Sequence, residues 1–269
     1  MRLPSGLAIV SLGVLALLYA PIVLMGINSV NSDESLLGWG GFTTRWFRQA
    51  VDNPDVRSGL WISVQVALLS TVISLALAVA GALWARSASR GGRQLLDVST
   101  YARIIMPETV VAIGLFLLLR RQDVELGVAT IVIGHVVFNS AYATIIIQAR
   151  LATLDTTLEA AAADLGATPW CAFRRVTLPL ILPAVIAAAL LTFSFSFDDV
   201  VTSLFLGGPD AQTLPVLLLG LIRLHVTPEV NAIGVLVMMT TIALFALAAV
   251  MLSVRTAAGA RFNAGRGEK

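Results

Sequence analysis

Charge is the scarcest property of this sequence. Only 13% of its 269 residues are Asp, Glu, Lys or Arg, whereas 57% are hydrophobic. Soluble domains carry roughly 25% charged residues, so about half of the usual solvating charge is missing. This deficit argues against an ordinary soluble protein of this length and indicates a lipid environment.

Cysteine and lysine are almost absent as well. Cys171 is the single cysteine, which excludes an internal disulfide and any multi-cysteine metal site. Lys269 is the single lysine, and a P-loop requires Gly-Lys-Ser or Gly-Lys-Thr, so this chain has no ATP site of that kind. His135 and His225 have no partner at metal-ligand spacing, and no nucleophile lies beside a base. We therefore predict no catalytic residue, no metal site and no cofactor in this chain.

Long apolar runs are what the sequence has instead. A helix needs about 20 largely apolar residues to cross the hydrocarbon core of a bilayer. Six such runs, separated by short polar connectors, cover residues 6–27, 60–83, 95–119, 127–147, 180–206 and 232–254. We predict an all-α integral membrane protein of about six transmembrane helices, with residues 1–269 forming one transmembrane domain. The first run is too long for a signal peptide and lacks an Ala-x-Ala site, so we expect it to be an uncleaved span.

The basic residues are distributed unevenly between the two sides of this topology. If the N-terminus lies in the cytoplasm, most of the 18 Lys and Arg residues fall on the cytoplasmic side, including Arg86, Arg90 and Arg93. The positive-inside rule therefore predicts that both termini are cytoplasmic. The connector at residues 150–177 then lies in the cytoplasm too.

This connector, residues 150–177, is polar but strongly patterned. Thr156 and Glu159 have the spacing of a capping box at the start of a helix. Gly166 stands where a left-handed helix end is expected, and Thr168-Pro169 is typical of a second helix start. We predict two short helices joined at a glycine turn. An amphipathic helix of this kind either docks on its own membrane helices or binds a partner, and the pattern alone allows both.

Three ionisable side chains lie deep in the predicted spans, and all three are acidic: Glu108, Asp198 and Asp199. Glu108 follows Pro107, which removes a backbone donor and interrupts the third run at Met106-Pro107-Glu108. No Lys or Arg lies at matching depth to pair with the acids. Ionisable groups inside spans are costly and mark candidate functional sites. A cation or a proton is therefore expected to balance them.

We predict that the two aspartates lie on one continuous helix in the fifth run. At 100° per residue, Ser194, Phe195, Asp198 and Asp199 fall on one half of such a helix, with the ring between the carboxylates. A ring flanked by carboxylates suits an organic ammonium ion through cation–π and ion-pair contacts. The alternatives are aspartates bonded to backbone or to a partner's basic residue, and a ring that only packs.

Other polar and aromatic residues near these spans have two readings. Asn139 and Tyr142 in the fourth run either line the same pathway or make interhelical hydrogen bonds. Phe193 and Phe197 fall on the opposite half of the helix, and we expect them to pack against lipid or a neighbouring helix.

The cytoplasmic connector also carries a family resemblance. Residues 159–167, Glu-Ala-Ala-Ala-Ala-Asp-Leu-Gly-Ala, followed by Phe173, Leu178-Pro179 and Pro183, resemble the EAA loop of binding-protein-dependent ABC importer permeases. The resemblance implies a MetI-like fold whose loop forms a coupling helix in a groove of a separate ATPase subunit. The sequence departs from the motif at one point, because Ala160 stands where the family has glutamate and Glu159 lies one position earlier. The residues to which the resemblance assigns ATPase coupling are Glu159, Ala160, Asp164, Gly166 and Ala167.

The same resemblance implies a set of partners. They are two ATP-binding subunits, which hold ATP and magnesium, a second homologous permease that makes a heterodimer, and an extracytoplasmic solute-binding protein. It also implies a multi-pass protein of the bacterial inner membrane.

A narrower resemblance bears on the cargo. The stretch 196–203, Ser-Phe-Asp-Asp-Val-Val-Thr-Ser, with Gly208-Pro209, Leu214-Pro215 and residues 228–232, is similar to the spermidine/putrescine branch of these permeases, and so is Pro107-Glu108. It implies a polyamine cargo. The predicted pathway residues are Glu108, Ser194, Phe195, Asp198 and Asp199. Alternative cargoes of related branches are 4-aminobutyrate, thiamine, ferric iron and aminophosphonates.

Two other classes of protein compete with an ABC permease. A secondary transporter would couple uptake to protons through Glu108 and Asp198, but it leaves the patterned cytoplasmic connector unexplained. A membrane scaffold that transports nothing leaves three unpaired deep acids without a purpose.

Overall fold

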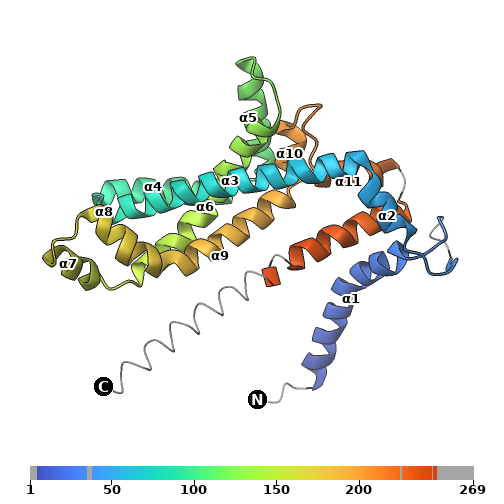
Figure 1. Ribbon diagram of the computed structural model, residues 1–269, viewed down its shortest axis with the longest axis horizontal. Helices are drawn as coiled ribbons and strands as arrows, with labels where there is room; N and C mark the ends of the chain where they lie inside the picture. Colours follow the sequence, from blue (N-terminus) through green and yellow to red (C-terminus); the bar gives the residue numbers. More distant parts are fainter. Residues whose placement is uncertain (1–4, 35–37, 225, 244, 247–269) are drawn as a thin grey trace. The chain divides into compact units, whose positions relative to one another are not determined.

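The structure is a computed structural model that describes residues 5–34, 38–224, 226–243 and 245–246. Within these residues the chain is helical, and the one strand-like feature is an antiparallel bridge between Asn31 and Phe42. The prediction of an all-α protein is confirmed (Figure 1). His225, the end of the sixth predicted span (247–254) and Lys269 lie outside the described residues.

Four helical segments in the described part are long and apolar enough to cross a membrane. A helix satisfies its own backbone N–H and C=O groups, as a lipid interior requires because it holds no water. These segments are α1 (Ser5–Ser29), α3 (Pro54–Ser87), α6 (Val128–Ala152) and Pro169–Phe197, the last made of α8 (Pro169–Ala172), the π-helical turn η1 (Phe173–Thr177) and α9 (Leu178–Phe197).

The third predicted span is divided in two. Helix α4 (Arg90–Ile105) ends before Pro107, and α5 (Glu108–Arg121) begins after it at an angle of 102°. Proline cannot donate a backbone hydrogen bond, so the helix breaks where the sequence predicts it. The bend places Glu108 in the first turn of α5.

The fifth predicted span is not one helix. Helix α9 ends at Phe197, residues 198–200 are not part of either helix, and α10 (Val201–Leu206) follows. The prediction of a continuous helix through both aspartates is therefore wrong. Two shorter apolar helices come after the break, α11 (Leu214–Leu224) and a helix over Pro228–Ala243.

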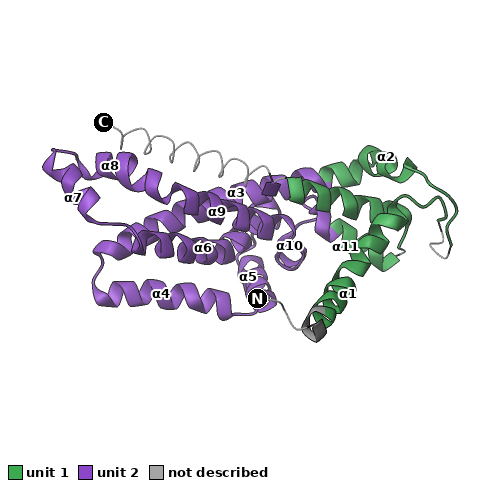
Figure 2. Ribbon diagram, turned by 90° about the horizontal axis from the view of Figure 1, so that it is seen from below, with its two compact units in different colours: residues 1–58, 217–244 green, residues 59–216, 245–269 purple. Residues whose placement is uncertain are grey.

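Contacts divide the chain into two compact units, which Figure 2 colours separately. In unit 1, the connector between α1 and α2 (Arg45–Asp52) is folded around Asn31. The Asn31 side chain donates from Nδ2 to the Gly38 carbonyl at 2.7 Å and accepts at Oδ1 from the Gly40 N–H at 2.9 Å. The buried Trp46 indole donates to the Asn31 carbonyl at 2.7 Å, which fixes α2 against this connector.

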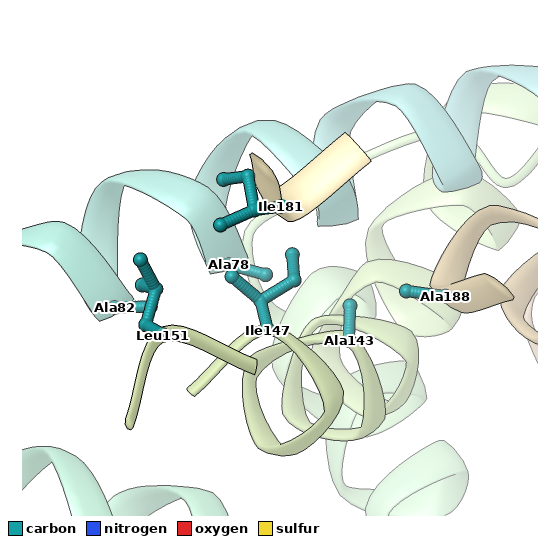
Figure 3. Packing of buried hydrophobic residues seen from close by; sticks show 7 residues of the cluster. All are labelled: Ala78, Ala82, Ala143, Ile147, Leu151, Ile181 and Ala188. Carbon is teal, nitrogen blue, oxygen red and sulfur yellow. The ribbon is translucent and has the colours of Figure 1, made fainter. Parts of the chain in front are cut away.

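Unit 2, residues 59–216 and 245–246 in the described part, contains the predicted acids and the patterned connector. In it α6 packs on α4, α9 and α10, and α10 packs on α5. Small side chains let the helix backbones approach closely. Figure 3 shows the core where α3, α6 and α9 meet, formed by Ala78, Ala82, Ala143, Ile147, Leu151, Ile181 and Ala188.

Candidate functional site

The break between α9 and α10 presents two adjacent aspartates in different ways. Asp198 is the C-cap residue of α9, and its backbone N–H donates to the Ser194 carbonyl at 3.0 Å. Asp199 accepts backbone N–H bonds from Thr202 at 3.3 Å and from Ser203 at 2.9 Å. A carboxylate that accepts the first N–H groups of a helix caps that helix. Asp199 therefore caps the start of α10, and the helix breaks here although the sequence has no proline or glycine at this point.

A histidine on α6 completes the environment of Asp199. His135 Nε2 lies 2.9 Å from Asp199 Oδ2, and His135 Nδ1 lies 2.5 Å from Ser196 Oγ. The two side chains of the pair are only 3% and 8% exposed. The sequence predicts only a structural or interfacial role for His135 and no Lys or Arg beside the deep acids, and its pairing with Asp199 is a contact that this prediction does not include.

Glu108 reaches the same region from α5. Thr202 Oγ1 donates to Glu108 Oε1 at 3.0 Å, and the Glu108 and Asp199 carboxyl groups lie close enough to interact. No Arg or Lys of the described residues forms an ion pair with Glu108, Asp198 or Asp199. The three acids thus gather at one place, and only Asp199 has a basic partner.

These acids border a cavity of about 730 Å³. Tyr142 and Phe195 meet edge to face in its wall, with ring centroids 5.1 Å apart, and the Phe195 side chain remains 45% exposed. Asn139 lines the cavity and also donates to the Thr192 carbonyl of α9 at 3.2 Å. It thus makes the interhelical hydrogen bond while it borders the cavity. The predicted residues that line the cavity are Glu108, Asn139, Tyr142, Ser194, Phe195, Asp198 and Asp199.

The structure thus brings all five predicted pathway residues to one cavity, by a geometry that differs from the predicted one. Asp198 is exposed to the cavity, whereas Asp199 turns into the protein toward His135. Phe193 and Phe197, both on α9, stack on each other with centroids 5.7 Å apart, and Phe197 is buried; their packing against lipid or a neighbouring helix stays a prediction. His135 is the functional candidate that the sequence reasoning missed, although an ionisable group inside a span is itself a signal.

The cytoplasmic connector has the predicted form of two short helices and a glycine turn. Helix α7 (Thr157–Asp164) ends near Gly166, whose φ of +80° lies in the left-handed region that favours glycine. Thr168 Oγ1 then accepts from the Cys171 N–H at 3.3 Å, and Pro169 occupies the first position of α8. The turn and the second helix start are confirmed.

The capping box predicted for this connector is wrong. The Thr156 side chain makes no capping bond, and Asp155 Oδ1 instead accepts from the Thr157 N–H at 2.9 Å. That bond lowers the pKa of Asp155 below its ordinary value. The helix start is still capped, but by the residue one position earlier.

Glu159 is bonded elsewhere. Its Oε1 accepts from Arg86 Nη1 of α3 at 2.8 Å and from Thr177 Oγ1 at 2.5 Å. The hydrogen bond from Arg86 lowers the pKa of Glu159, against the opposing effect of partial burial. Glu159 therefore ties the connector back to the membrane helices of this chain.

Other side chains of the connector face away from the chain. Leu165, beside the glycine turn, is 89% exposed, and Trp170 is 68% exposed. Ala160, Asp164 and Gly166 are exposed too, whereas Ala167 is half-buried. Docking of the connector on its own bundle is thus observed through Glu159, whereas binding of a partner by the exposed face stays a prediction. In the described part, no group of three His, Cys, Asp or Glu is arranged to hold a metal ion.

Comparison with known proteins shows the family. Residues 77–263 match the model of the binding-protein-dependent transport system inner membrane component. The chain is 34% identical over 244 residues to the putrescine transport system permease protein PotI of Escherichia coli K12, covering 88% of this chain and 86% of that one. It is 33% identical over 237 residues to the spermidine/putrescine transport system permease protein PotC of Haemophilus influenzae, covering 87% and 91%.

Solved structures show the same fold. A chain of a bacterial ABC transporter involved in the import of the acidic polysaccharide alginate superposes with a TM-score of 0.71 at 15% identity, covering 92% of this chain and 93% of that one. The predicted fold class is confirmed. Its apolar helices and its match to transport permeases show that the chain is a multi-pass transport subunit, and it belongs to the family of binding-protein-dependent inner membrane transport components.

Proposed function

We propose that this chain is the permease subunit of an ATP-driven importer of polyamines such as putrescine and spermidine. The observation that carries the proposal is the acidic cavity, where Glu108 and Asp198 lie exposed beside an aromatic pair. The two relatives PotI and PotC, both named as polyamine permeases, support the same cargo.

The chemistry of the cavity fits an organic cation with more than one charge. Exposed carboxylates attract ammonium groups, and in a medium of reduced dielectric this attraction is stronger than in water. The Tyr142 and Phe195 rings supply apolar contact for a methylene chain and a face for an ammonium ion. An anionic cargo would be repelled by the same groups.

Energy for transport comes, in this proposal, from ATP and magnesium held by two ATPase subunits. The exposed face of the connector, with Asp164, Gly166 and Leu165, contacts an ATPase, while Glu159 secures the other face to α3. A second homologous permease completes the membrane part as a heterodimer, and an extracytoplasmic solute-binding protein delivers the cargo. Both termini and the connector then lie in the cytoplasm, with six spans in the membrane.

Uptake of radiolabelled putrescine and spermidine tests the function directly. The complete complex, with its cognate binding protein, is reconstituted in proteoliposomes that contain ATP. Asp198→Asn keeps the side-chain volume and removes the charge, so we expect uptake to fall about tenfold or more, which corresponds to about 1.4 kcal/mol. Asp210→Asn is a matched control, because Asp210 is an exposed acid of unit 2 that does not line the cavity.

Two outcomes would contradict the proposal. If the wild-type complex takes up neither amine, the cargo is another solute. If uptake proceeds with a proton gradient and no ATP, the chain works as a secondary transporter.

A further inference from the structure

A chain of buried hydroxyl and imidazole groups leads to one of the two aspartates. Ser70 Oγ of α3 donates to Ser196 Oγ of α9 at 2.9 Å, and Ser196 Oγ contacts His135 Nδ1 at 2.5 Å. His135 Nε2 then contacts Asp199 Oδ2 at 2.9 Å. The residues Ser70, Ser196 and His135 are at most 4% exposed. Three helices and the α9–α10 break are thus joined by one continuous set of hydrogen bonds.

The direction of these hydrogen bonds follows from the last one, because the Asp199 carboxylate can only accept and His135 Nε2 must therefore carry a hydrogen. With a neutral imidazole, Nδ1 then accepts from the Ser196 hydroxyl, whose oxygen accepts from Ser70; Ser70 Oγ also lies 3.3 Å from the Ala67 carbonyl. A neutral imidazole that accepts at Nδ1 carries its hydrogen on Nε2 and donates it to Asp199. Each hydrogen in this series of bonds then points toward the Asp199 carboxylate, and this arrangement satisfies a buried anion.

Asp199 has little capacity left for a ligand. Its Oδ2 accepts from His135, from the Ser203 N–H and from Ser203 Oγ at 3.1 Å, and its Oδ1 accepts from the Thr202 N–H. A carboxylate offers about four acceptor sites, so these bonds nearly saturate it. Asp198, by contrast, is exposed, and its side chain makes no hydrogen bond or ion pair within the described residues.

We propose that His135 is a positioning residue that holds Asp199 as the anchor of the α9–α10 break, and that Asp198 alone of the two aspartates contacts the cationic cargo. The proposal rests on the proposed function and divides the roles within the same cavity. Anchoring Asp199 fixes residues 198–200, and Asp198 consequently stays at the cavity with Glu108. The helix break is then part of the recognition site.

Two substitutions of His135 distinguish its contact with Asp199 at Nε2 from its contact with Ser196 at Nδ1. The amide nitrogen of Gln reaches about as far as Nε2, so His135→Gln keeps a donor for Asp199. The amide of Asn reaches only the position of Nδ1, so His135→Asn keeps contact with Ser196 and loses Asp199. We expect putrescine uptake per inserted complex to stay within about threefold of wild type in His135→Gln and to fall tenfold or more in His135→Asn. A residue that merely fills space would give similar losses in both.

Double variants test the division of roles. We expect Asp199→Asn to add little to the loss in His135→Asn, because both remove the same bond. Asp198→Asn should multiply the loss of His135→Gln by the factor that it has alone, and should raise the KM for putrescine. Insertion of each variant is measured from the amount of assembled complex in the vesicles.

Specific outcomes overturn the proposal. Equal losses in His135→Gln and His135→Asn, or multiplying losses for His135→Asn with Asp199→Asn, show that His135 does not act through Asp199. Either result leaves polyamine transport by the wild-type complex intact. Failure of the wild-type complex to transport polyamines instead removes the proposed function itself.

Discussion

Two acid–base pairs in this protein have similar chemistry and very different surroundings. In the cavity wall His135 holds Asp199, and in the cytoplasmic connector Arg86 holds Glu159, each acid also accepting from a hydroxyl group. The first pair is 3% and 8% exposed, and the second is 27% and 32% exposed. An ion pair open to water contributes about 0–1 kcal/mol, whereas a buried hydrogen bond from a neutral imidazole to a carboxylate contributes about 1.5–3 kcal/mol.

This difference in burial suits the position of each pair. A buried pair that is costly to break keeps the α9–α10 break in one shape. A pair that is about one third exposed opens at little cost, which suits a connector that, in the proposed function, follows a moving ATPase subunit. The chain thus uses one kind of interaction both for a rigid site and for an adjustable attachment.

The largest expected effect comes from removing each base in turn. His135→Leu removes the imidazole donor from the buried Asp199 carboxylate, and we expect the free energy of unfolding to fall by about 3 kcal/mol, as for loss of a buried hydrogen bond to a charged group. Arg86→Leu should lower it by about 0.5 kcal/mol, because water replaces the lost partner. Thermal unfolding of the purified proteins in detergent measures both. Equal shifts in the two variants would mean that burial does not distinguish the pairs.

The glycine turn of the connector should show an intermediate effect. At Gly166, with its φ of +80°, an added Cβ meets no neighbouring atom within 4 Å, so the main cost of a substitution there comes from the backbone conformation. A β-branched residue held in the left-handed region costs about 2 kcal/mol. We expect Gly166→Val to insert in the membrane and to separate ATP hydrolysis from putrescine uptake in proteoliposomes.

A control for Gly166→Val is available in α7. Ala161→Val adds the same side chain at an exposed helical position, where the expected cost is a few tenths of a kcal/mol by helix propensity. Normal coupling in Gly166→Val would show that the turn geometry is not needed for contact with the ATPase.

The smallest expected effect is a pH dependence of the connector. The pKa of Glu159 is below its unfolded value of about 4.3, so the stabilisation by this group is complete above about pH 4.3. It is lost as the pH falls through the lower, folded-state pKa. We expect Glu159→Gln to remove this acid-dependent part of stability, seen as a flatter dependence of thermal unfolding on pH. An unchanged profile would mean that the Arg86 bond contributes nothing to stability.

The sequence predicts the helices and the connector because their signals are local. Apolar runs of about 20 residues, Pro107 and Gly166 each act on their own neighbourhood. The break at Asp198 and Asp199 has no such signal, since no proline or glycine lies between α9 and α10. It depends on His135, which is 64 residues away in the chain. The partner of Glu159 is likewise 73 residues away, and pattern reasoning assigned that glutamate to a local capping box.

The alanines between α3, α6 and α9 have a mechanical consequence for a transport cycle. Ala78, Ala82, Ala143 and Ala188 present only methyl groups at the contact, beside the larger side chains of Ile147, Leu151 and Ile181. Domain closure by shear consists of small slides of packed helices past one another. Long interdigitating side chains would have to change rotamer at each step of such a slide, whereas methyl groups glide over one another with their packing largely kept. The alanine part of this contact therefore allows α3, α6 and α9 to slide past one another by small distances. Such a slide can move the cavity and the connector together.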